Sequence, residues 1–161
     1  MLEDQLLNPS TDGVVVGSIL LDKPAGDVES NKSNANRNDV QPEELSDAYR
    51  EYLTSSLVKY GIAHEPGKKK YVTNITILGY KEGSAFIRWL TPAGGESKIV
   101  VQATLELGDV VIGGVESQQS IAWGGGFSIA GWRHVIRWSA QEVGQKLCQK
   151  MFRDNVSELG C

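Results

Sequence analysis

The sequence has no long apolar run. A helix that spans a membrane needs about 20 consecutive, mostly apolar residues, and no stretch of the 161 residues approaches that length. The first residues also lack the basic segment followed by an apolar segment that marks a secretory signal peptide. The sequence shown therefore predicts neither a membrane-spanning helix nor an export signal, and composition alone leaves the compartment open.

Positive charge is scarce as well. The chain has 16 Lys and Arg against 20 Asp and Glu, which gives a formal net charge of -4 and a pI of about 5.2. Proteins with a general affinity for nucleic acid carry excess positive charge, because they must neutralise backbone phosphates. We therefore expect no nucleic-acid partner.

Cysteine and histidine are rare, with two residues of each. Zinc sites use closely spaced pairs of these residues, whereas Cys148, Cys161, His64 and His134 are scattered. Neither histidine lies in a recognisable arrangement with a nucleophile that it could activate. The sequence thus predicts no metal, no cofactor and no catalytic residue, and a protein that is not an enzyme.

The two cysteines leave two interpretations open. The 12 residues between Cys148 and Cys161 can loop back to close a disulfide, which requires an oxidising compartment. Alternatively, Cys148 is a semi-buried thiol on a helix and Cys161 is a free thiol at the chain end.

Residues 98–153 organise the rest of the chain. Residues 99–107 alternate apolar and polar side chains, the period of a strand with one buried face, and Gly108 and Asp109 follow as a turn. Residues 110–117 are again β-like, so the two segments predict an antiparallel hairpin.

A helix with one apolar face ends this unit. Apolar residues recur at steps of three and four, at Ile136, Ala140, Val143, Leu147 and Met151. The small residues Ala140 and Gly144 predict that the helix approaches the sheet closely. Glu142 and Lys146 are spaced to form an i,i+4 ion pair.

The preceding residues predict two more strands and another helix. Residues 14–21 are nearly continuous β-branched and apolar residues, as in a central strand. Residues 71–80 alternate like a strand. Between them, Pro42 suits the first turn of a helix, which extends to about residue 60 with one apolar face.

These segments predict an α+β fold in the order β-α-β-β-β-α. We expect an antiparallel sheet of about four to five strands with two helices packed on one face. The predicted organisation is a lead-in segment at 1–12, a single domain at 13–153 with a flexible loop at about 24–41, and a tail at 154–161. The loop is rich in Asn, Ser and Gly and nearly free of apolar residues.

The segment 84–96 is the strongest candidate for a partner-binding site. It groups apolar and aromatic side chains around one positive charge, in Phe86, Arg88, Trp89 and Leu90. Such a group either continues the sheet as a strand or forms an exposed aromatic tip for a protein partner.

A glycine-rich segment joins the last predicted strand to the last helix. Backbone amides in such a position can bind an anion, and the candidate site here comprises Gly124, Gly125, Gly126 and Phe127, with Arg133 and Arg137 as charge partners. The segment lacks the Lys-Ser/Thr ending of a P-loop and the spacing of a dinucleotide-binding fingerprint. The alternative is a sharp turn among bulky aromatic residues, which needs glycine for steric reasons.

The order of these motifs resembles a family of bacterial cell-envelope lipoproteins of unknown function. The resemblance rests on residues 87–90, 93–95 and 97–105, the glycine-rich crossing and the closing helix, and it covers about residues 12–153. It implies a strand-helix-strands-helix domain in the periplasm or at the outer membrane, tethered through a lipidated cysteine that the sequence shown does not contain.

The resemblance also implies how such a domain works. It favours a non-catalytic role through binding of other envelope proteins or self-association, with the membrane contacted only through the lipid anchor. The alternative function, from the glycine-rich segment, is binding of a small ligand or anion.

Overall fold

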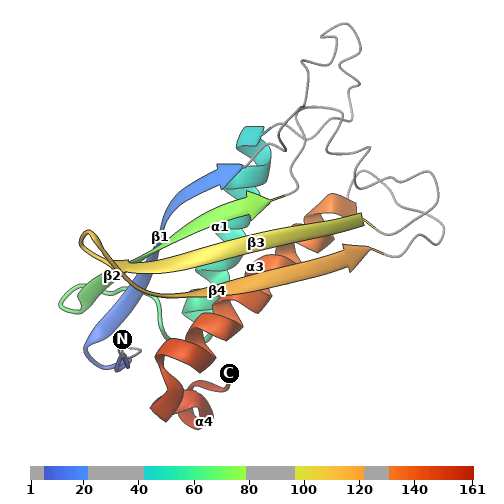
Figure 1. Cartoon of the computed structure of the whole chain (residues 1–161). Helices are drawn as coiled ribbons and strands as arrows, with labels where there is room; N and C mark the ends of the chain where they lie inside the picture. The colour runs from blue at the N-terminus through green and yellow to red at the C-terminus, as the bar shows by residue number, and fades with distance from the viewer. Residues whose placement is uncertain (1–5, 22–41, 79–96, 122–130) are drawn as a thin grey trace, which may run out of the picture.

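The computed structural model describes residues 6–21, 42–78, 97–121 and 131–161. Its elements in chain order are β1 (Asp12–Leu21), α1 (Pro42–Lys59), β2 (Lys69–Leu78), β3 (Ser97–Leu107), β4 (Val110–Ile121), α3 (Gly131–Met151), the 3-10 helix η2 (Arg153–Asn155) and α4 (Val156–Leu159). The predicted α+β class and the order β-α-β-β-β-α are confirmed for the six long elements (Figure 1). The segment predicted as a tail contains α4. The loop predicted at 24–41 lies outside the described residues.

The four strands form one sheet in the order β1-β2-β3-β4. The prediction of a central strand at residues 14–21 was therefore wrong, because among the described residues β1 is an outer strand with Val15 and Leu20 exposed. β2 pairs antiparallel with β3, and β3 pairs antiparallel with β4. However, β1 and β2 run parallel, so the prediction of a purely antiparallel sheet was wrong for this pair. The reason is topological: α1 lies between the two strands in the chain and returns it to the end where β1 began, so β2 must run in the same direction.

One face of the sheet is buried. Over residues 71–78 of β2 and 100–105 of β3, the odd-numbered residues face the core and the even-numbered residues face away. The buried residues of the two strands are Tyr71, Thr73, Ile75, Ile77, Val101, Ala103 and Leu105. The apolar residues among them belong to a single hydrophobic cluster with the apolar faces of α1 and α3.

The two long helices pack against each other as well as against the sheet (Figure 1). Gly144 of α3 lies against Ser56 of α1, so closely that a Cβ added at Gly144 would be 2.1 Å from the Ser56 Oγ. The sequence predicted a close approach at Gly144 but assigned it to the sheet. The neighbour is the other helix, because α1 and α3 lie side by side.

The opposite side of the sheet, which we call the outer face, is not covered by any element of the described ranges. Val15 and Val72 lie on it in neighbouring strands, as do Thr104 and Gly114. Its exposed residues are Val15, Leu20, Gln102, Thr104, Val111, Glu116 and Gln118. Within the described ranges, no helix has the length and apolar character needed to cross a bilayer.

Candidate functional site

Most of the site residues predicted from the sequence lie outside the described ranges. These are the partner-binding candidates Phe86, Arg88, Trp89 and Leu90 and the anion-binding candidates Gly124, Gly125, Gly126 and Phe127. Both assignments therefore stay predictions. The remaining two residues, Arg133 and Arg137, belong to α3, and Arg137 is half-buried.

The described residues contain a connected set of polar side chains between α1, α3 and β4, which we call the α3–β4 network. It begins in the core, where the Tyr49 and Ser139 hydroxyls are 3.1 Å apart. Ser139 donates to the Ser117 Oγ over 3.2 Å, and Ser117 donates to the Glu142 carboxylate over 3.0 Å. The network thus connects a buried tyrosine to a carboxylate at the surface of the helix.

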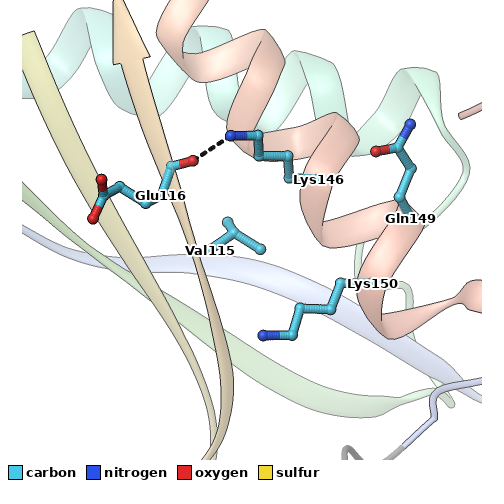
Figure 2. Close-up of a pocket in the computed structure, with 5 residues that line it drawn as sticks. All are labelled: Val115, Glu116, Lys146, Gln149 and Lys150. Carbon is cyan, nitrogen blue, oxygen red and sulfur yellow. Dashed lines mark hydrogen bonds between the residues drawn. The ribbon is translucent and has the colours of Figure 1, made fainter.

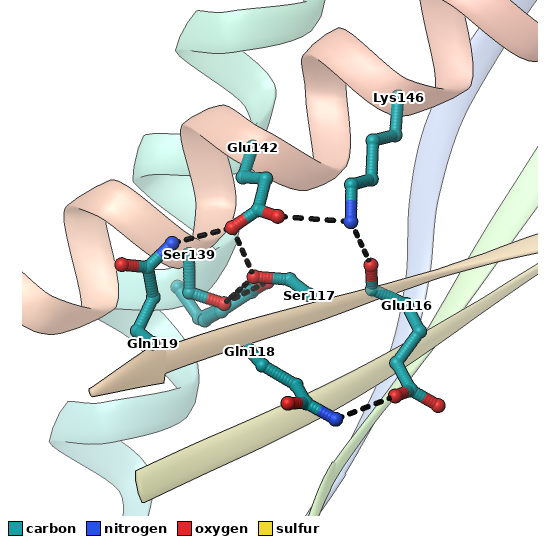
Figure 3. Close-up of polar contacts among 8 residues, drawn as sticks. Glu116, Ser117, Gln118, Gln119, Ser139, Glu142 and Lys146 are labelled. Atoms are coloured by element: carbon teal, nitrogen blue, oxygen red, sulfur yellow. Dashed lines mark hydrogen bonds and ion pairs between the residues drawn. The ribbon is translucent and has the colours of Figure 1, made fainter.

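Glu142 is the centre of this network (Figure 3). Besides Ser117, its carboxylate accepts a hydrogen bond from the Gln119 amide and forms an ion pair with Lys146 at 2.9 Å. The predicted i,i+4 pair of Glu142 and Lys146 is therefore confirmed. The Lys146 ammonium also donates to the Glu116 carbonyl over 2.5 Å, so one side chain joins the carboxylate and the backbone of β4.

These contacts determine the acidity of Glu142. Burial acts to raise the pKa of Glu142, but the hydrogen bonds from Lys146, Ser117 and Gln119 and the charge of Lys146 lower it by more. The resulting pKa lies below its usual value, because the partners all stabilise the ionised form. A carboxylate stabilised in this way is a poor proton acceptor.

The hydroxyls of the network are also poorly placed for chemistry. Ser117 and Ser139 are fully buried, and burial raises the pKa of Tyr49 well above its usual value, more than the hydrogen bond with Ser139 lowers it. A nucleophilic serine needs both access and a strong neighbouring base. We interpret the α3–β4 network as a cross-link that fixes α3 and α1 to the edge of the sheet.

An open groove lies beside this network (Figure 2). It has a volume of about 340 Å³ and is lined by Val115, Glu116, Lys146, Gln149 and Lys150. Lys150 donates to the Gly114 carbonyl over 2.8 Å, so both lysines reach from α3 to the backbone of β4. The groove therefore follows the open edge of β4, with two ammonium groups on it. Within the described ranges, no cluster of three or more His, Cys, Asp and Glu could hold a metal ion.

The structure settles the question of the cysteines in favour of a disulfide. Cys148 of α3 and Cys161 at the chain end are bonded, with their Cα atoms 6.1 Å apart, within the usual range for disulfides. The Gln149 amide donates to the Cys161 carbonyl over 2.7 Å. These contacts fix the last residues against α3, where sequence reasoning allowed a free terminal thiol.

Sequence reasoning found one pair of the α3–β4 network and missed the rest. The spacing of Glu142 and Lys146 revealed their ion pair, because a helix places residues four apart on one side. Ser117 and Ser139 gave no signal, because isolated serines in a strand and a helix are ordinary surface residues in sequence. Only the alternation of β4, which turns Ser117 toward the core, could have indicated that its hydroxyl needs a partner.

Comparisons with known proteins add a similarity of fold. No protein-family model and no curated protein matches the sequence. Among solved structures, the chain is similar to a PelC dodecamer from Paraburkholderia phytofirmans, with a TM-score of 0.50, 16% sequence identity, and coverage of 88% of this chain and 91% of that one. At this identity the similarity shows a shared fold.

Two further structures match with lower scores. One is a "putative lipoprotein" from Caulobacter crescentus, with a TM-score of 0.49, 12% identity and coverage of 93% of each chain. The other is a protein from Xanthomonas campestris assigned to DUF330, with a TM-score of 0.47, 11% identity, and coverage of 96% of this chain and 95% of that one. Both TM-scores are below 0.5, so these two structures support no conclusion about this chain.

Proposed function

We propose that this chain is a non-catalytic domain of the bacterial cell envelope that works by binding proteins, with other copies of itself as the first partner. The observation that carries the proposal is the outer face of the sheet. Antiparallel sheets can leave one face to water, but here Leu20 is 61% exposed and Val111 is 47% exposed. Val15 is exposed on this face as well, and exposed apolar side chains that share one face of a protein are a feature of interaction surfaces.

The shared fold supports self-association as the mode of binding. PelC, whose fold the chain shares over most of its length, is described as a dodecamer. A fold does not determine a function, so the dodecamer supports the hypothesis only together with the outer face.

The disulfide supports an envelope location. Disulfides persist in oxidising compartments such as the periplasm and are rare in the cytosol, and Cys148 and Cys161 are bonded in this fold. The resemblance to envelope lipoproteins adds a lipid anchor to the hypothesis, in the periplasm or at the outer membrane. The membrane would then be contacted through that anchor.

We assign the first contact surface to the segment that contains Phe86, Arg88, Trp89 and Leu90. Aromatic residues and arginine carry much of the binding energy in protein interfaces, and this segment combines both types. The proposal is testable without further knowledge of its conformation. A tagged copy of the chain is used to capture an untagged copy, and Trp89→Ala is compared with the unchanged sequence.

The control is Trp138→Ala, which removes a half-exposed tryptophan from α3. We expect Trp89→Ala to reduce capture and Trp138→Ala to leave it unchanged. Equal capture by Trp89→Ala and the unchanged chain would remove this segment from the interface. Failure of the unchanged chain to capture its copy would contradict self-association itself.

A further inference from the structure

In the part of the chain that the structure describes, β1 and β4 are the outer strands of the sheet, and each has one edge that no neighbouring strand pairs. Such edges are ready-made sites for pairing with another chain, and proteins protect them with cationic side chains or covering segments. The two edges of this sheet are protected in different ways.

The β1 edge is covered by backbone and by an arginine. The Val14 amide donates to the Ile62 carbonyl, and the His64 amide donates to the Val14 carbonyl, so residues 62–64 pair with the first half of β1. Further along, the Arg50 guanidinium donates to the Val16 carbonyl over 3.1 Å and to the Gly17 carbonyl over 2.8 Å. The part of β1 with these contacts cannot accept another strand without losing several hydrogen bonds.

Within the described ranges, the β4 edge is protected by two lysine side chains. Lys146 donates to the Glu116 carbonyl and Lys150 donates to the Gly114 carbonyl, both from the same side of α3 (Figure 2). Gly114 and Glu116 are two residues apart, so their carbonyls lie on the same side of β4. Both carbonyls bond to lysines of α3 and not to β3, so this side is the edge where a further strand would pair. The lysines thus occupy the acceptors that an added strand would use.

The sequence of β4 is itself suited to pairing. Its first six residues, Val110 to Val115, contain no charged side chain, and four of them are β-branched. Segments with high β-propensity and low charge associate readily when their edge is exposed. Two copies of β4 could pair antiparallel about a two-fold axis, since such an interface is self-complementary.

We propose that the edge of β4 can pair with β4 of a second copy, and that Lys146 and Lys150 prevent this pairing in the native chain. Their protection is both steric and electrostatic. In a two-fold pair the α3 helices of both copies would flank the junction, which brings four ammonium groups toward one another. Repulsion between these like charges opposes association.

This inference goes beyond the proposed function and uses a different surface. It concerns pairing that the native chain prevents, whereas the proposed function concerns a segment at 84–96 and the outer face. A monomeric native chain would contradict the proposed function but would agree with the inference that the lysines prevent pairing at the β4 edge.

The test replaces both lysines by methionine, which keeps the apolar stem and removes the ammonium group. We expect Lys146→Met/Lys150→Met to sediment at about twice the mass of the unchanged chain at the same concentration, as expected for a two-fold pair. The matched control is Lys69→Met/Lys70→Met, which removes the same charge from two exposed residues of β2. The control should sediment like the unchanged chain.

Two more variants make the result decisive. Lys150→Met alone leaves the ion pair of Glu142 and Lys146 in place, so it tests the edge if the double variant fails to fold. Glu116→Pro in the double-variant background removes an amide that faces the open edge and should restore the original mass, because proline blocks pairing on that side. Folded lysine variants that sediment like the unchanged chain, or association that survives Glu116→Pro, would overturn the proposal.

Discussion

At the scale of single residues, the core contains two hydroxyl groups without a hydrogen-bond partner among the described residues. They are the Ser56 Oγ and the Thr73 Oγ1, and both side chains are buried. An unpaired buried hydroxyl costs about 1–3 kcal/mol of stability, because it loses water and gains nothing in return. The presence of a small residue, serine, at position 56 is explained by the close approach of Gly144, which leaves no room for a larger side chain. Nothing in the structure explains the hydroxyl of Thr73.

The first prediction concerns Thr73. Thr73→Val keeps the shape of the side chain and removes the unpaired hydroxyl, so we expect the free energy of unfolding to rise by about 1 kcal/mol. Urea unfolding followed by circular dichroism measures the change. Thr104→Val makes the same replacement on the exposed face of β3 and should change stability by less than about 0.5 kcal/mol. A destabilised Thr73→Val would show that the hydroxyl has a partner after all.

At the scale of elements, one carboxylate makes several of the polar contacts that attach α3 to β4. Glu142 accepts hydrogen bonds from Ser117 and Gln119 and pairs with Lys146. Its folded-state pKa is lowered, so its contribution to stability is present above the unfolded pKa of about 4.3 and is lost as the pH falls through the folded value. The join between helix and edge strand should therefore weaken in acid.

The second prediction follows from the lowered pKa of Glu142. Glu142→Gln keeps the size of the side chain and removes its charge, so we expect it to lower the free energy of unfolding at pH 7 by about 1.5–3 kcal/mol, the value of hydrogen bonds to a charged group. The difference from the unchanged chain should shrink below about pH 4. Urea unfolding across a pH series measures it.

The control for this series is Glu51→Gln on the exposed side of α1, which removes the same charge from a residue without these contacts. It should change stability little at any pH. A loss in Glu142→Gln that stays constant from neutral to acidic pH would assign the effect to packing and not to the ionised carboxylate.

The disulfide acts on a second pair of elements, the end of α3 and the chain terminus. The third prediction is that reduction lowers the free energy of unfolding by about 3 kcal/mol, the expected value for a loop of this length, given a separation of 13 residues between Cys148 and Cys161. Denaturant unfolding with and without a reductant measures the change. Cys161→Ser should be insensitive to reductant, and sensitivity in that variant would place the effect elsewhere.

At the scale of the whole molecule, the sequence predicted what local patterns determine. Alternation identified β2 and β3 and the buried face of β3, and steps of three and four identified the buried face of α3. The parallel pairing of β1 and β2 was missed, because a strand's direction depends on how the chain returns over the sheet and not on the strand's own residues. The neighbour of Gly144 was missed for the same reason.

The candidate sites were less predictable than the fold. The α3–β4 network joins residues from three elements, and isolated residues such as Ser139 give no pattern in sequence. The lysines on the β4 edge likewise read as ordinary surface residues of a helix until the edge strand is placed beside them. Predicting such sites requires knowing which surfaces the folded chain leaves exposed.

The most direct test of the account is the mass of the oxidised, unchanged chain in solution, measured by sedimentation velocity over a series of concentrations. The fourth prediction is a mass of several chains that rises with concentration, because the proposed function is self-association. A mass of one 17.5 kDa chain at every concentration would contradict the central claim.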